Sequence, residues 1–130
     1  MKLIYIFLAL FPFQVIGANQ FSFQSSENNN LYFLVTDSVQ KDYPLVKYKV
    51  IINYSSEEIK VFNNKTIRSS QRKILINCEN NTYKILENYG YENFGAYGKK
   101  IVMPLNKGHA LIINSYSPTE VNSKFVCFKN

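Results

Sequence analysis

Apolar side chains recur at every second residue in much of the chain between residues 21 and 113. The clearest alternation runs over residues 46–54, where Val, Tyr or Ile alternates with lysines, one isoleucine and one asparagine. A period of two is typical of a half-buried strand in an antiparallel sheet. The continuous apolar run at residues 31–35 predicts a second strand, covered on both faces or at its edge, and residues 37–44 are expected to turn the chain.

A β-hairpin is predicted over residues 73–89. Ile74, Ile76 and Cys78 would share one face, and Asn80-Asn81 would form the turn, because asparagine tolerates a positive φ angle. A two-residue turn at that place sets Cys78 opposite Tyr83. Two more strands are expected at residues 101–105 and 110–113, joined by residues 106–109.

The pattern changes to that of a helix near the end of the chain. Ser117, Pro118 and Glu120 form a capping-box pattern, with the serine as N-cap and proline at the first helical position. The apolar stripe expected to face the sheet comprises Val121, Phe125 and Phe128, with Cys127 at its edge. The predicted fold is therefore α+β and mainly β: one antiparallel sheet of about five to six strands with a C-terminal helix.

The start of the chain has the layout of a secretory signal. Lys2 precedes an apolar run over residues 3–13, and small residues follow at Gly17 and Ala18. A transmembrane helix needs about 20 apolar residues, and Pro12 and Gln14 interrupt this run. We therefore expect residues 1–17 to be cleaved and residues 18–130 to form one exported domain without a transmembrane segment, in the periplasm, on the cell surface or secreted.

Export would place the two cysteines in an oxidising compartment. In an oxidising compartment an even pair such as Cys78 and Cys127 most often forms a disulfide. The alternative is one catalytic thiol paired with His109, but no neighbouring residue indicates an activated thiolate.

Composition disfavours an enzyme. His109 is the only histidine, so no multi-histidine metal site can form. Glu57 and Glu58 are adjacent and would point to opposite faces of a strand, which does not suit a glycosidase-type pair. We expect no catalytic residues, no metal and no cofactor.

A basic stretch is the first candidate binding segment. It carries Lys60, Lys65, Arg68, Arg72 and Lys73, with no acidic residue after Glu58. As a loop it could bind an acidic protein surface, an anionic glycan or a phosphate, and equally it could be a solvated loop that guards a sheet edge. The net charge of +6, or +5 without residues 1–17, is weak evidence for nucleic acid, which is not expected for an exported chain.

The second candidate is the Tyr-Gly segment at residues 88–98. It contains Tyr89, Tyr91 and Tyr97 among three glycines. Tyrosine contributes large contact area at low cost in side-chain entropy, which favours a contact loop. The other reading is a long hairpin connection whose tyrosines fold back onto the sheet.

A family resemblance extends over nearly the whole domain. The residues that carry it are Asp37-Ser38-Val39, Ser69-Ser70, Asn77-Cys78, Tyr83, Tyr89, Val102-Met103-Pro104 and Val126-Cys127. In this order they resemble the bacterial surface-adhesin protein E family. The resemblance implies a small antiparallel sheet tied to a C-terminal helix by a disulfide, here Cys78 to Cys127. It also implies adhesion to host extracellular-matrix and serum proteins such as laminin and vitronectin.

Two features depart from the family pattern. Phe21 and Phe23 stand where members commonly have a tryptophan, and no cysteine for lipid attachment follows the signal. We therefore expect an exported, non-enzymatic binding protein, adhesin-like, with a protein or anionic glycan partner. The alternative is a periplasmic accessory or inhibitor protein that binds another protein. An exposed edge strand would also allow a homodimer.

Overall fold

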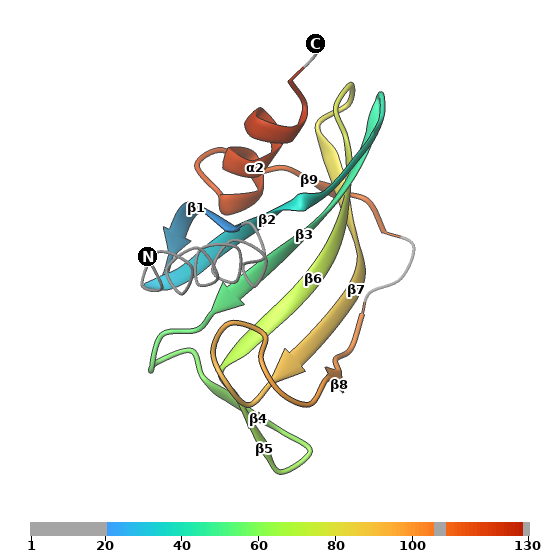
Figure 1. Cartoon of the computed structure of the whole chain (residues 1–130). Helices are drawn as coiled ribbons and strands as arrows, with labels where there is room; N and C mark the ends of the chain where they lie inside the picture. The colour runs from blue at the N-terminus through green and yellow to red at the C-terminus, as the bar shows by residue number, and fades with distance from the viewer. Residues whose placement is uncertain (1–20, 106–108, 129–130) are drawn as a thin grey trace, which may run out of the picture.

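A computed structural model describes residues 21–105 and 109–128 of the chain (Figure 1). The predicted signal sequence and most of the predicted connection at residues 106–109 lie outside these residues. The strands are β1 (Phe21–Glu27), β2 (Asn30–Asp42), β3 (Leu45–Asn53), β4 (Lys60–Phe62), β5 (Lys65–Ile67), β6 (Ser69–Asn77), β7 (Thr82–Tyr91), β8 (Ile101–Val102) and β9 (Leu111–Ile112), and the helix is α2 (Pro118–Val126).

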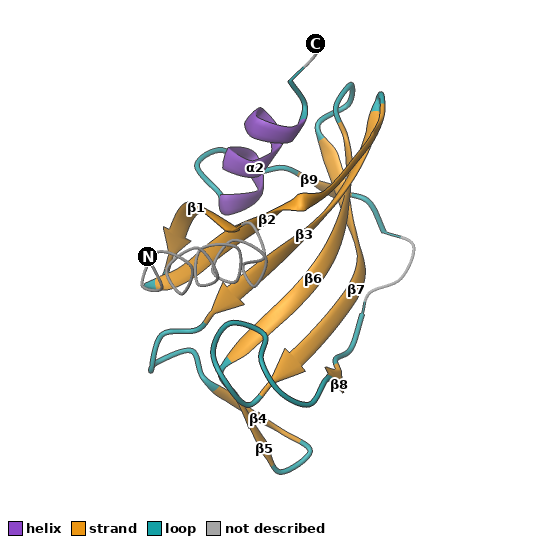
Figure 2. Ribbon diagram, viewed as in Figure 1, coloured by secondary structure: helices purple, strands orange, loops and turns teal. Residues whose placement is uncertain are grey.

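One antiparallel sheet dominates the described chain, in the order β1-β2-β3-β6-β7. Strands β8 and β9 both pair with β7, β8 near the C-terminal end of that strand and β9 near its start, so the sheet is six strands wide (Figure 2). Strands β4 and β5 form a separate hairpin between β3 and β6. The predicted sheet with a C-terminal helix is confirmed.

Asparagine pairs make the tight turns of two hairpins. Asn28-Asn29 joins β1 to β2 and Asn63-Asn64 joins β4 to β5, all four with positive φ angles between 50° and 64°. Asparagine reaches this region more readily than other residues that carry a Cβ atom. The short polar pairs therefore set the register of both hairpins.

The β6–β7 turn differs from the prediction. Asn77 pairs with Thr82, so the connection is the four-residue segment 78–81, and only Asn81 in it has a positive φ. The Asn77 side chain accepts hydrogen bonds from the backbone N–H groups of Glu79 and Asn80, which stabilises the longer turn. As a result Ile76, and not Cys78, lies opposite Tyr83.

The prediction that residues 37–44 turn the chain was also wrong in extent. Strand β2 continues to Asp42 through an irregularity between Val35 and Gln40, and the turn is confined to Tyr43-Pro44. Ser38 lies in the irregular part: its Oγ donates to the Val35 carbonyl and accepts from the backbone N–H of Lys49. This hydroxyl keeps β2 attached to β3 where the regular ladder is interrupted.

Strands β8 and β9 are each two residues long, shorter than predicted. Pro104 has no N–H to donate, so a longer ladder stops there. Backbone hydrogen bonds continue the attachment just beyond each strand: Met103 donates to Asn88 and Ile113 donates to Asn81.

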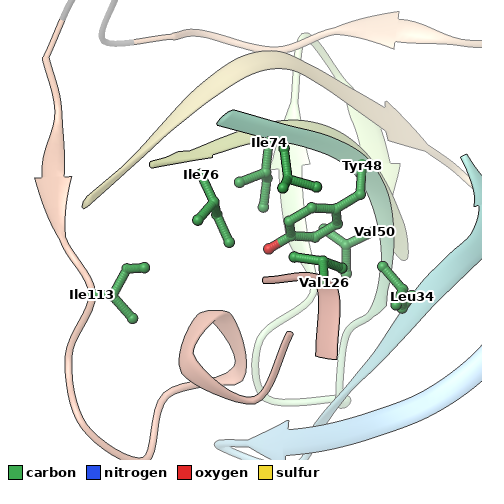
Figure 3. Close-up of a cluster of buried hydrophobic side chains, with 8 residues drawn as sticks. Leu34, Tyr48, Val50, Ile74, Ile76, Ile113 and Val126 are labelled. Carbon is green, nitrogen blue, oxygen red and sulfur yellow. The ribbon is translucent and has the colours of Figure 1, made fainter. Parts of the chain in front are cut away.

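The core lies between the sheet and α2. Its side chains come from β2, β3, β6, the residue after β9, and the helix (Figure 3). They are Leu34, Val46, Tyr48, Val50, Ile74, Ile76, Ile113 and Val126. Burying one such side chain stabilises the fold by about 1.5–3 kcal/mol. Burial also raises the pKa of Tyr48, although the neighbouring Asn122 side chain partly opposes this.

Helix α2 begins as predicted but presents a different face. Ser117 is the N-cap, and its Oγ accepts the backbone N–H of Glu120 at 3.1 Å. The predicted stripe was wrong: Phe125 and Phe128 are exposed, and the buried helical residues are Pro118, Asn122, Ser123 and Val126. Val126 packs in the core, and the polar Asn122 and Ser123 are buried beside it.

A disulfide fixes the end of this helix. Cys78, in the β6–β7 turn, is bonded to Cys127, the C-cap of α2, with 5.7 Å between their Cα atoms. Both cysteines pack against the core. Closing a loop of 50 residues stabilises a domain by about 4 kcal/mol in the chain-entropy model.

Candidate functional site

The two faces of the sheet differ in chemistry, because cross-strand partners share a face. The face toward α2 holds the core. The opposite face, here called the open face, contains two neighbouring rows of cross-strand partners on β3, β6 and β7. The first row is Lys49, Lys73 and Glu87; the second is Ile51, Gln71 and Tyr89.

A hollow of about 440 Å³ lies on the open face where the two rows begin. Its lining residues are Val35, Asp37, Ser38, Gln40, Lys49, Ile51, Gln71 and Lys73. The irregularity of β2 at Ser38 contributes one wall, so the same feature that interrupts the ladder shapes the hollow.

Lysine ammonium groups exceed carboxylates on this face. Lys49 and Lys73 line the hollow with one acidic residue, Asp37, and Glu87 lies across from Lys73 on β7. Within residues 21–105 and 109–128, no ion pair involves either lysine. Two lysines directly opposite each other repel, and with Asp37 and Glu87 nearby but in no ion pair with them, a negatively charged partner would stabilise the arrangement further.

The predicted basic stretch does not form one loop. Lys60 lies in β4 and Lys65 in β5, whereas Arg72 and Lys73 are consecutive residues of the central strand β6. Consecutive residues of a strand point to opposite faces, so Lys73 lies on the open face and Arg72 on the face toward α2. The prediction failed because residues 69–73 are polar in composition, although they begin a strand that is held between β3 and β7.

Two of the predicted cations contact the start of the β7–β8 connection. Lys65 forms an ion pair with Glu92 at 3.7 Å, and the Arg68 guanidinium donates to the Glu92 backbone carbonyl at 3.0 Å. These contacts position the β4–β5 hairpin against the end of β7. Lys60 is exposed in the hairpin.

The three predicted tyrosines have three different environments. Tyr91 is buried, with 6% of its surface exposed, whereas Tyr97 is 74% exposed. Tyr89 lies on the open face, and the Lys100 ammonium is 4.2 Å from the centre of its ring, a cation–π contact. Tyr97 is therefore exposed, Tyr89 is half-buried beneath Lys100, and Tyr91 is part of the packed structure.

Residues 92–100 fold back toward the sheet (Figure 1). The Ser69 hydroxyl donates to the Asn93 carbonyl and accepts from the backbone N–H of Ala96 at 2.9 Å. The Asn53 side chain accepts from the backbone N–H of Gly95 at 2.7 Å. Gly95 has a φ angle of 74°, which favours glycine. The connection is therefore anchored at its middle and exposes Tyr97.

The predicted alternative of a catalytic thiol is wrong, because both sulfur atoms are in the disulfide. His109 is exposed. Within the described residues, no group of three or more His, Cys, Asp or Glu side chains is arranged to hold a metal ion. The same residues include no helix with the length and apolarity needed to cross a membrane.

The sequence matches the family model of surface-adhesin protein E over residues 21–128. The chain belongs to the surface-adhesin protein E family. The match includes every strand and the helix described above, so the resemblance inferred from the cysteine, tyrosine and proline order is confirmed.

Solved structures of protein E from Haemophilus influenzae share the fold of this family member. Crystal form II has a TM-score of 0.61 at 15% sequence identity, and the match covers 85% of this chain and 93% of that chain. A second structure, of protein E from non-typeable H. influenzae, has a TM-score of 0.58 at 15% identity, covering 81% and 74% of the two chains. No curated protein sequence matches the chain.

Lys49 and Lys100 are two residues of the open face that were not among the predicted site residues. The alternation over residues 46–54 already places Lys49 on the polar side of its strand. Its proximity to Lys73 depends on the β3–β6 register, which joins residues 24 positions apart and has no local sequence signal. Lys100 reaches Tyr89 only because the connection folds back.

Proposed function

We propose that this surface-adhesin protein E family member is an exported, non-enzymatic binding protein whose open face binds an acidic partner. The partner class is a host extracellular-matrix or serum protein, or an anionic glycan on it. The observation that carries the proposal is the position of Lys49 opposite Lys73 in the 440 Å³ hollow, with no ion pair to either among the described residues.

Acidic groups of a partner would relieve the repulsion between these lysines. A like-charged cross-strand pair destabilises a sheet by roughly 0.2–1 kcal/mol, and a partner carboxylate or sulfate placed between the two ammonium groups reverses the sign of that interaction. Lys47 and Lys84 lie on the same face in the next row, and Lys100 lies over Tyr89. Positive charge thus extends along the open face beyond the hollow.

Export is the condition for this function. The predicted signal over residues 1–17 and membership in a surface-adhesin family both support it. Fractionation of the producing cells, followed by protease treatment of intact cells, tests the location. Protein digested on intact cells agrees with the proposal. Protein found only in the periplasm favours the alternative, an accessory or inhibitor protein that binds another protein there.

The binding proposal is tested with the domain 18–130 on surfaces coated with heparin, laminin or vitronectin. We expect binding that weakens as salt rises, because screening reduces attraction between exposed charges. The double variant K49Q/K73Q should lose most of this binding. The matched control K60Q/K65Q removes the same net charge from the β4–β5 hairpin and should bind nearly as well as the unmodified domain.

The control separates the open face from the hairpin. If K60Q/K65Q loses binding and K49Q/K73Q does not, the hairpin is the contact surface and the open face is not. Binding that is the same in all three proteins and insensitive to salt would rule out an electrostatic site on either surface.

A further inference from the structure

A second hollow lies on the face of the sheet toward α2, between β6, β7 and residues 104–105 and 109–111. Its volume is about 420 Å³, within the range of small-molecule sites. The described residues that line it are Arg72, Ile85, Asn88, Pro104, Leu105, His109, Ala110 and Leu111. None of them belongs to the hollow on the open face.

Two polar residues, Arg72 and Asn88, line this hollow. Arg72 and Asn88 are Cα partners on β6 and β7. Arg72 Nε and Asn88 Oδ1 are both buried, and neither has a hydrogen-bond partner among the described residues. A buried donor or acceptor without a partner costs about 1–3 kcal/mol. Both residues line the hollow, so the fold maintains two unpaired polar groups on neighbouring strands beside it.

The charge of Arg72 is also uncompensated. No ion pair in the described part of the chain includes it, and no carboxylate lines the hollow. Arg68, four residues earlier, donates to a backbone carbonyl instead. The positive charge of Arg72 lowers the pKa of Tyr32, although burial raises that pKa more strongly. An oxyanion is the group that a guanidinium in such a place binds best.

The walls are mostly apolar. Ile85, Pro104, Leu105 and Leu111 line the hollow together with the exposed His109, and Leu111 is 45% exposed. A free inorganic ion would leave these walls in water. A carboxylate that carries an apolar chain would pair with Arg72 and would also cover the apolar lining residues.

We propose that this hollow binds a small organic carboxylate with an apolar chain. The carboxylate accepts hydrogen bonds from Arg72, and the chain lies against Ile85 and Leu111. A hydroxyl or amine next to the carboxylate would donate to Asn88 Oδ1. The site is on the other side of the sheet from Lys49 and Lys73, so it does not depend on the proposed binding of an acidic partner.

The test is an NMR titration of the ¹⁵N-labelled domain 18–130 with octanoate. Two matched probes are octanol, which has the chain without the carboxylate, and inorganic phosphate, which is an oxyanion without the chain. We expect octanoate to shift the amide signals of Ile85, Asn88 and Leu111 in a saturable way, and the two control probes to bind much more weakly.

Variants locate the site. Arg72→Met keeps the apolar stem and removes the charge, and we expect it to weaken octanoate binding about tenfold or more, as for loss of a charge-assisted hydrogen bond. The control Arg68→Met should bind octanoate like the unmodified domain. Because Arg72 Nε has no partner, Arg72→Met should fold, and its thermal melting checks this.

Several outcomes would overturn the proposal. Absence of saturable shifts with octanoate excludes the site. Equal binding of octanol excludes a role for the carboxylate, and equal binding of phosphate excludes a role for the apolar walls. Octanoate binding that survives Arg72→Met in a folded protein, or that shifts only amides of the open face, places the ligand elsewhere.

Discussion

Lys49 on β3 and Lys73 on β6 are Cα partners on the same face of the sheet, and both line one hollow. Paired cations in the middle of a sheet oppose folding, whereas the same pair presents two ammonium groups to an acidic ligand. Stability and binding should therefore respond in opposite directions to a change of charge at this position.

Lys49→Glu replaces a like-charged pair with an oppositely charged pair. We expect the free energy of unfolding to rise by roughly 0.2–1 kcal/mol at low salt, and binding to heparin to fall. Urea denaturation at low and high salt measures the first effect. Lys47→Glu is the control, since its Cα partners are Gln40 and Leu75 and carry no charge. An equal gain in both variants would show that net charge, and not the facing pair, sets the effect.

The disulfide between Cys78 and Cys127 predicts a large loss of stability on its removal. The double variant C78A/C127A should unfold more easily by about 4 kcal/mol, because its unfolded chain regains the freedom that the closed loop had restricted. Denaturant titration measures the difference, and a mass measurement of the oxidised domain should show the loss of two hydrogens. Two free thiols in the exported protein would contradict the bond.

Local sequence patterns correctly predicted strand β3 and the start of helix α2, because the residues of each segment alone determine its structure. The alternation over residues 46–54 corresponds to β3 at Leu45–Asn53, because a strand with one buried face must alternate. Ser117 marked the start of α2, because its hydroxyl caps the helix whatever the helix packs against. These signals are local and need no knowledge of the partner strands.

The predictions that failed depended on contacts between distant segments. Phe125 was expected in the core because it is apolar, but the bond from Cys127 to Cys78 and the packing of Val126 turn that side of α2 away from the sheet. Arg72 was placed in a loop because its surroundings are polar, but β3 and β7 pair with it from both sides. Position in the sheet overrode local composition in both cases.

Gly90 is predicted to tolerate no side chain. A Cβ atom there would lie 2.9 Å from Met103 Sδ and 3.1 Å from two carbon atoms of Ile67. We expect Gly90→Ala to destabilise the domain by about 1–3 kcal/mol through overpacking, measured by denaturant titration. The double variant G90A/M103A removes the sulfur contact. Its loss in the free energy of unfolding should therefore be smaller than the sum of the losses in the two single variants.

Tyr48 predicts a loss of stability in alkaline solution. Its ring is in the core, its hydroxyl is buried next to the Asn122 side chain, and burial raises its pKa more than Asn122 lowers it. The unfolded chain loses this proton near pH 10, where the folded chain still keeps it. The unfolded state then binds fewer protons, so its free energy falls relative to the folded state as pH rises. The contribution is complete below pH 10 and decreases by up to about 1.4 kcal/mol per pH unit above it.

Tyr48→Phe isolates this effect. It should unfold much like the unmodified domain at pH 8 and become the more stable of the two at pH 11, as measured by urea denaturation at both values. Tyr97→Phe is the control, because Tyr97 is 74% exposed and the substitution removes the same hydroxyl group from the surface and not from the core. If the unmodified domain and Tyr48→Phe lose the same stability between pH 8 and pH 11, the Tyr48 hydroxyl ionises as readily in the folded domain as in the unfolded chain.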